Sequence, residues 1–282
     1  MTTAFVLSGG ASLGAIQVGM LQSLFAAGIE PDLLLGTSVG ALNAGYIAGH
    51  PGPAGADALA EIWQSLRSTR VFPITPAMGL RGLVGRANHL VSPDALRALV
   101  REHVGFARLE ESVIPFQVVV ADARSGEEVV LSSGDSVEAI VASAAIPGIF
   151  PPVTIDGVEL MDGGVADNTP ISNAVELGAD VVYVLPTGHT CGALDPPRSA
   201  LGMVMHAITI LIGQQLVRDI EHYGDQIELH VVPPLCPLTV FPMDFRHARE
   251  LISRGRDSTT AWLEASRPVS HSLGRHGHET SP

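Results

Sequence analysis

The stretch LLLGTSVGAL, residues 33–42, places the pattern Gly-x-Ser-x-Gly between an apolar run and a helix-like segment. The apolar run over residues 32–35 predicts a short buried strand, and residues 39–48 predict a helix. Ser38 therefore falls on the turn from a strand to a helix, which is the setting that a nucleophilic serine requires. Because so short a pattern also occurs by chance, Ser38 is either such a nucleophile or an ordinary serine in a βα turn.

The neighbours of Ser38 favour the nucleophile. A tight turn strains the backbone of its central residue and leaves room only for small flanking residues, which Gly36 and Gly40 are. The helix that follows directs the positive end of its dipole toward the serine and so stabilises developing negative charge. We expect the Ser38 hydroxyl to protrude at the end of a sheet.

A second unit of the same kind precedes this one. Residues 3–7 predict a strand, and apolar residues recur at helical spacing over 15–27 before Gly28. Two strands that alternate with two helices predict a parallel sheet and an α/β fold. The loop 8–14 is then expected beside Ser38, because the carboxyl ends of parallel strands meet at one edge of the sheet.

This loop is a candidate oxyanion hole. Gly9, Gly10 and Ala11 carry no bulky side chain, so their backbone N–H groups can point at a developing oxyanion. The alternative is a dinucleotide-binding loop, which would need glycine at position 11 in a frame that ends at Gly14. It would also need an acidic residue at the end of the second strand, where the sequence has the Ser38 turn instead.

Asp162 is the candidate base for Ser38. It closes the second strand of a predicted hairpin whose turn is Asp156-Gly157, and it precedes Gly163 and Gly164, which let backbone and substrate approach its carboxylate. An aspartate in an ordinary turn remains an equally good interpretation from the local sequence. A triad of α/β-hydrolase type would instead use a histidine later in the chain, although none stands in a comparable small-residue turn. The histidines late enough for that role are His206, His222, His230 and His247.

Composition predicts one large domain without a nucleic-acid partner. The chain has 282 residues, of which 46% are hydrophobic and 16% are charged, and this is enough to bury a core over residues 1–265. Residues 266–282 are polar, and we expect a disordered tail there. The net charge is −13 and lysine is absent, which argues against binding to nucleic acid or to anionic membranes.

The sequence also sets expectations about location, thiols and metals. It opens without the pattern of a secretory signal, and its most apolar later stretch, residues 200–213, is too short to span a bilayer. We expect that stretch to form a buried or interfacial helix of a soluble cytoplasmic protein. Cys191 and Cys236 are expected to be two reduced thiols. No cluster with metal-ligand spacing occurs in residues 1–265, so we expect neither a metal nor a cofactor.

Four segments in a fixed order, spread over residues 4–186, together resemble the patatin-like phospholipase family of lipid acyl hydrolases. The segments are LSGGASLGAIQVGML, GTSVGALNAG, ASAAIPGIFPP and MDGGVADNTP. The resemblance implies a three-layer α/β/α sandwich with a central, mostly parallel sheet, built as one acyl hydrolase domain. It also implies a Ser-Asp dyad without histidine or metal, with Ser38 as nucleophile, Asp162 as base and oxyanion donors in the loop Gly9-Gly10-Ala11.

The sequence departs from the family pattern in this loop. The family commonly has a third glycine and a basic residue where this chain has Ala11 and Leu13. Leu13 removes a positive charge that would help to hold the oxyanion, so the hole would depend on backbone dipoles. If residue 11 needs a positive φ angle, alanine costs about 1–2 kcal/mol there.

The activity implied by the resemblance is hydrolysis of carboxylic esters of phospholipids or related lipids through an acyl-enzyme. A lipid ester is then the partner, with transient contact with a membrane surface. The apolar residues over 71–91 form either a wall or lid for an acyl chain, or a packed connecting loop. Two alternatives stay open: a non-catalytic lipid-binding or acyl-binding protein of the same fold, and an esterase with a Ser-His-Asp triad.

Overall fold

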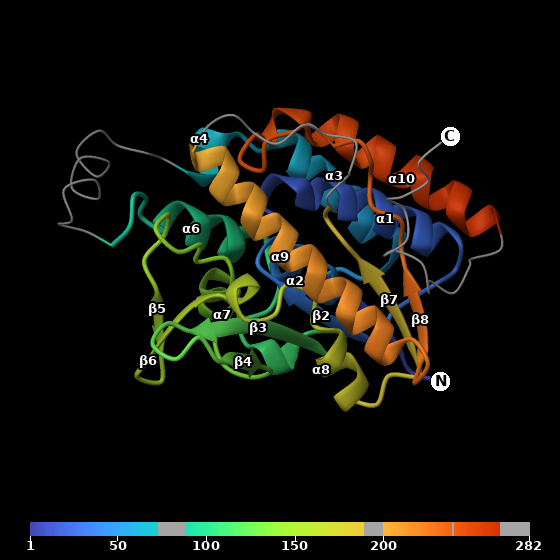
Figure 1. Ribbon diagram of the computed structural model, residues 1–282, viewed down its shortest axis with the longest axis horizontal. Coiled ribbons are helices and arrows are strands. Elements are labelled where there is room, and N and C mark those ends of the chain that lie inside the picture. The colour runs from blue at the N-terminus through green and yellow to red at the C-terminus, as the bar shows by residue number, and fades with distance from the viewer. Residues whose placement is uncertain (73–87, 189–199, 239, 266–282) are drawn as a thin grey trace, which may run out of the picture.

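The computed structural model describes residues 1–72, 88–188, 200–238 and 240–265, and Figure 1 shows a central sheet flanked by helices. This architecture confirms the predicted α/β/α class. The expected tail, 266–282, lies outside the described residues, as does most of the expected lid.

The sheet has eight strands in the order β5-β6-β3-β2-β1-β7-β8, with β4 paired to β3 beside this path. Strands β3, β2, β1, β7 and β8 are paired in parallel, and β4, β5 and β6 join through antiparallel pairs, so the sheet is mostly parallel as predicted. The strands are β1 (Thr3–Leu7), β2 (Leu33–Thr37), β3 (Phe116–Asp122), β4 (Glu128–Leu131), β5 (Val153–Ile155), β6 (Val158–Asp162), β7 (Val181–Leu185) and β8 (Glu228–Val231).

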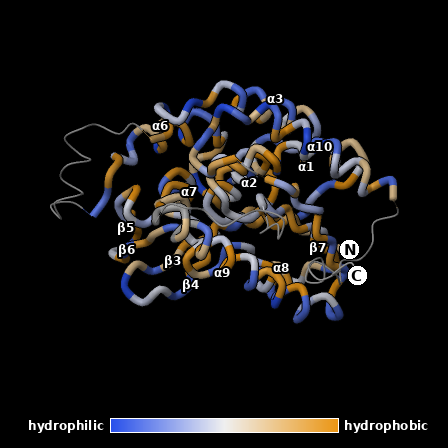
Figure 2. Tube along the Cα trace, turned by 45° about the horizontal axis from the view of Figure 1, so that its top comes forward, coloured by the Kyte–Doolittle hydropathy of each residue, from blue (hydrophilic) through white to orange (hydrophobic). Residues whose placement is uncertain are grey.

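Two helical layers bury the two faces of the sheet. Alternate residues of a strand point to opposite faces, so Phe5 and Leu7 pack with α1, α2, α3 and α10, whereas Val6 and Leu35 pack with α8 and α9. Figure 2 shows hydrophilic residues along the outer side of α3, where the helix meets solvent. The helices are α1 (Gly14–Ala26), α2 (Val39–Gly49), α3 (Gly52–Ser65), α4 (Ser68–Val71), α6 (Asp94–His103), α7 (Ser136–Ser143), α8 (Ile171–Glu176), α9 (Ala200–Tyr223) and α10 (Ala248–Glu264).

The predicted hairpin is present and positions Asp162. Asp156 and Gly157 have φ angles of 49° and 83°, the positive values that a tight turn between antiparallel strands requires. In the resulting register Asp162 of β6 lies opposite Val120 of β3, and Thr37 of β2 lies opposite the neighbouring Val119. The residue after Thr37 is Ser38, so the sheet itself brings serine and aspartate together.

Two further expectations are tested by the described residues. Cys236 is disulfide-bonded, so the prediction of two reduced thiols was wrong; Cys191, the other cysteine of the sequence, lies outside the described residues. Within the described part of the chain, no helix has the length and apolar character needed to cross a membrane.

Candidate active site

Ser38 has the strained backbone of a nucleophile elbow. Its φ and ψ angles are 55° and −123°, a region that residues with a side chain seldom occupy. The turn closes tightly against β1, because a Cβ atom at Gly40 would collide with the carbonyl oxygen of Leu7. Position 40 therefore requires a residue without a side chain, as predicted from the sequence, because the backbone of Gly40 packs directly against the backbone of β1.

Ser143 stabilises the elbow from the end of α7. The Ser38 N–H donates to the Ser143 hydroxyl oxygen at 2.8 Å, and that hydroxyl donates to the Val119 carbonyl at 2.6 Å. Ser143 is fully buried. Sequence reasoning missed this residue, although it lies in the quoted segment ASAAIPGIFPP, because nothing in that segment assigns it a partner.

Asp162 accepts the hydrogen bond of the Ser38 hydroxyl. The Ser38 Oγ to Asp162 Oδ2 distance is 2.6 Å, and the other carboxylate oxygen accepts the Gly164 N–H at 2.8 Å. Gly163 lies against β3, where a Cβ atom would collide with the Val119 carbonyl. The two glycines thus let the chain turn beside the carboxylate while one of them supplies a donor to it.

Burial controls the protonation of this pair. Ser38 and Asp162 are only 6% and 7% exposed. Desolvation raises the pKa of Asp162 from its ordinary value to about 6, against the hydrogen bonds from Ser38 and Gly164, which lower it. The carboxylate is consequently a stronger base than an exposed aspartate, and it is still ionised at neutral pH.

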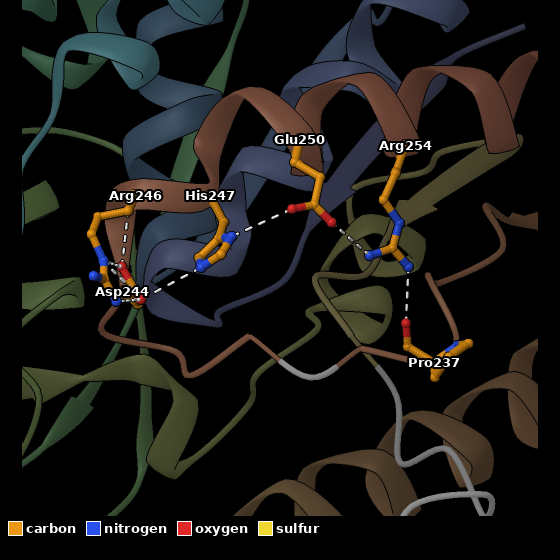
Figure 3. Close-up of polar contacts among 6 residues, drawn as sticks. All are labelled: Pro237, Asp244, Arg246, His247, Glu250 and Arg254. Carbon is orange, nitrogen blue, oxygen red and sulfur yellow. Dashed lines mark hydrogen bonds and ion pairs between the residues drawn. The ribbon is translucent and has the colours of Figure 1, made fainter.

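The four candidate histidines lie elsewhere. The Nε2 atom of His230 on β8 lies 2.7 Å from Glu228 Oε1, and its ring stacks on Tyr183. His247 sits between Asp244 and Glu250, as Figure 3 shows. Throughout the described residues, none of His206, His222, His230 and His247 is hydrogen-bonded to Ser38 or Asp162.

The predicted oxyanion loop lies beside Ser38, but its three N–H groups differ. The Gly9 N–H already donates to the Asn168 carbonyl at 3.2 Å. For Gly10 and Ala11, the described residues provide no acceptor to the backbone N–H. The free donors of the loop are therefore these two.

Ala11 has a φ angle of 51°, so the condition set from the sequence is fulfilled and alanine carries a strain of about 1–2 kcal/mol at this position. Thr187 helps to fix the loop, since its hydroxyl donates to the Gly9 carbonyl at 2.5 Å. Buried side-chain hydrogen bonds also fix the start of the loop. The Gln17 amide donates to the Ser8 and Leu185 carbonyls, and the Asn43 amide donates to Gln17 Oε1. None of these supporting residues had been identified from the sequence.

An apolar cavity begins at Ser38. It has an empty volume of about 830 Å³, part of it open to solvent, and both Ser38 and Ala11 line it. Val71 and Phe72, the first residues of the expected acyl wall, also line it, whereas residues 73–87 lie outside the described chain. Apolar side chains dominate the remaining lining, including Leu42, Leu59, Leu96, Val100, Ile140 and Phe150.

A serine on a strand-to-helix turn, hydrogen-bonded to a buried carboxylate at the edge of a three-layer α/β sandwich, defines the structural class. Within that class, the family model described as Patatin-like phospholipase matches residues 5–175. The chain belongs to the patatin-like phospholipase family.

Two relatives and one solved structure are similar to this chain to different extents. An uncharacterized NTE family protein of Mycobacterium tuberculosis is 31% identical over 184 residues, which are 64% of this chain and 48% of that protein. A protein named lysophospholipase NTE1 from Pyricularia oryzae is 24% identical over 65% of this chain and 12% of its own length. The chain thus spans about half the length of the first relative and far less of the second. The crystal structure of VipD from Legionella pneumophila shares the fold, with a TM-score of 0.51 and 15% identity over 94% of this chain and 67% of VipD.

The strain at Ala11 predicts a stabilising substitution. Ala11→Gly removes about 1–2 kcal/mol of strain but gives the unfolded chain extra entropy worth about 0.4–1 kcal/mol. We expect the free energy of unfolding in urea to rise by up to about 1.6 kcal/mol. Ala261→Gly, at an exposed position within α10, serves as the control and should lower it by about 0.5–1 kcal/mol. A loss at Ala11 equal to that at Ala261 would contradict the strain.

Proposed function

We propose that this chain is a serine lipid acyl hydrolase that cleaves carboxylic esters through a Ser38-Asp162 dyad and an acyl-enzyme. The observation that carries the proposal is the 2.6 Å hydrogen bond from the Ser38 hydroxyl to the buried Asp162 carboxylate. A nucleophile and its base must lie within this distance for proton transfer. Membership of the patatin-like phospholipase family supports a lipid ester as the substrate.

In the first half of the reaction, Ser38 Oγ attacks the ester carbonyl carbon and its proton passes to Asp162 Oδ2. The carbonyl oxygen becomes an oxyanion, which the N–H groups of Gly10 and Ala11 stabilise. Collapse of this intermediate breaks the bond to the alcohol or lysolipid, which leaves with the proton from Asp162. The acyl group is then an ester of Ser38.

In the second half, Asp162 takes a proton from water as the water oxygen attacks the acyl-enzyme carbonyl. The same N–H groups hold the second oxyanion, and its collapse releases the fatty acid while Ser38 Oγ recovers the proton from Asp162. Because the pKa of Asp162 is raised by burial, one carboxyl group can accept and return the proton near neutral pH.

The apolar cavity gives the acyl chain its site. Each buried methylene contributes about 0.8 kcal/mol to binding, so a cavity that starts at Ser38 and is lined by leucine, valine and phenylalanine favours medium or long chains. A non-catalytic acyl-binding protein would use the same cavity, and the dyad is what separates the two functions.

The dyad is tested by substitution. Ser38→Ala should abolish both fluorophosphonate labelling and ester hydrolysis, and Asp162→Asn should lower kcat/KM by about 10²–10⁴-fold because the general base is lost. Ser133→Ala and Asp225→Asn, at exposed positions, are the matched controls. An unlabelled wild-type protein that still binds fatty acid would establish the binding function instead.

The pH profile tests the base. The carboxylate is the active form, so kcat/KM should fall as pH drops through about 6, the raised pKa of Asp162. A histidine would give a similar midpoint, so His206, His222, His230 and His247 are each replaced with glutamine. If any one replacement costs as much activity as Asp162→Asn in a folded protein, a histidine is the base.

The cavity is tested by partial filling. Val100→Phe inserts a ring among the lining residues, so kcat/KM for a decanoyl ester should drop at least about tenfold relative to a butyryl ester, since several methylenes lose their site. Val113→Phe is the control, because Val113 is 69% exposed and does not line the cavity. An equal loss for both esters would mean that the chain does not occupy this cavity.

A further inference from the structure

The first half of α9 carries an unusual set of exposed apolar side chains. Met203, Ile208, Ile210 and Leu211 are 47%, 44%, 39% and 69% exposed. All five positions from 207 to 211 are exposed. Successive residues of a helix are turned by about 100°, so these four side chains fall within an arc of about 160° and form one broad apolar face of α9. We call these four residues the α9 patch.

The patch lies in an uncharged stretch. Residues 200–217 contain no Asp, Glu, Arg or Lys, and charge returns at Arg218 and Asp219. A contiguous exposed apolar face commonly marks a surface that contacts another protein or a lipid bilayer. The sequence allowed a buried or an interfacial helix here, and the exposure of residues 207–211 favours the interfacial one for this part of the stretch.

The second half of α9 fixes the patch next to the active site. Leu216 and Ile220 pack onto the sheet, and the Gln215 amide donates to the Ala166 carbonyl at 3.4 Å. Leu211 lies one turn before Gln215 on the same face of the helix. Val165, beside Ala166, is 52% exposed. The apolar surface therefore reaches the loop that follows Asp162, and Figure 1 shows α9 running from the β8 side of the sheet toward α4 and α6.

We propose that the α9 patch docks the protein on a lipid surface whose headgroups carry no net charge, by inserting into the boundary between headgroups and acyl chains. This inference rests on the proposed function, because such a surface presents the ester substrate next to the patch. The patch reaches toward the loop that follows Asp162, so a bilayer that covers it also lies close to the dyad. Apolar side chains on one face of a helix can be buried at the boundary between headgroups and acyl chains.

Charge decides which kind of lipid is bound. The chain carries a net charge of −13 and the patch has no basic neighbour in residues 200–217. Anionic lipids attract basic segments and repel acidic proteins. Docking through the α9 patch therefore favours zwitterionic phosphatidylcholine over a surface that contains phosphatidylserine.

Vesicle flotation tests the docking without hydrolysis. The full chain carrying Ser38→Ala is mixed with phosphatidylcholine vesicles and should float with them, and partial replacement by phosphatidylserine should weaken binding. Ile208→Glu with Leu211→Glu should weaken binding by about tenfold or more, since two charges enter the apolar layer. Leu177→Glu is the matched control, because Leu177 is a 45% exposed leucine at the C-terminal end of α8 and outside the patch, so its substitution should leave binding unchanged.

A second variant tests the proposal even if the variant with Ile208→Glu and Leu211→Glu does not fold. Leu211→Trp keeps the surface apolar, and its fluorescence should shift to shorter wavelength with phosphatidylcholine vesicles. Equal binding by the charged variant and the Leu177→Glu control, stronger binding to phosphatidylserine, or no shift at Trp would overturn the proposal. A change from dimer to monomer in the charged variant with lipid binding intact would assign the patch to a second copy of the chain, and would also overturn it.

The two proposals fail in different ways. If the protein binds vesicles through the patch but Ser38 is not labelled by fluorophosphonate, the hydrolase fails and the docking stands. If a soluble ester is hydrolysed but vesicles are not bound, the docking fails alone. With both correct, the ratio of the rate on vesicle lipid to the rate on a soluble ester should fall about tenfold in the charged variant and not in Leu177→Glu.

Discussion

The hydrogen bond between Ser38 and Asp162 joins residues 124 positions apart in the sequence. It forms only because the strands that carry the two residues are paired in the correct register. The serine comes from the turn after β2, and the carboxylate comes from the end of β6, an antiparallel addition to the parallel sheet. Only the pairing of both strands with β3 places the two side chains together. A shift of one residue in either register would turn one of them to the opposite face of the sheet.

Two features of this interaction are unfavourable in free energy. An ionised carboxylate is withdrawn from water, which raises its pKa, and the backbone of Ser38 is held at a positive φ angle. The surroundings offset these costs with hydrogen-bond partners at fixed positions: the Gly164 N–H donates to Asp162, and the Ser143 hydroxyl oxygen accepts the Ser38 N–H. Strain at a site persists only where the neighbouring structure over-determines it, and here the supports come from β3, α7 and the turn after β6.

In the proposed function, the cavity and the α9 patch are two apolar features that serve one lipid substrate. The cavity beneath the elbow is lined by α2, α3 and α6, while the α9 patch is exposed close to the loop after Asp162. In this proposal the acyl chain binds in the cavity, and the lipid surface from which it comes contacts the nearby α9 patch. The net charge of −13 fits the proposed docking, which depends on apolar contact and not on attraction to anionic headgroups.

The sequence by itself determined the features that depend on neighbouring residues. Apolar runs set β1 and β2, the Asp156-Gly157 dipeptide set the hairpin, and Gly-x-Ser-x-Gly set the elbow, because each of these follows from local backbone geometry and side-chain size. Ser38 and Asp162 were candidates on the same grounds. The tertiary structure alone decided that the Asn168 carbonyl accepts the Gly9 N–H, that Ser143 supports the turn at Ser38, that Cys236 is in a disulfide, and that residues 207–211 of α9 are exposed. Each of these depends on a contact, or on its absence, between segments far apart in the chain, which the spacing of residues along one segment does not encode.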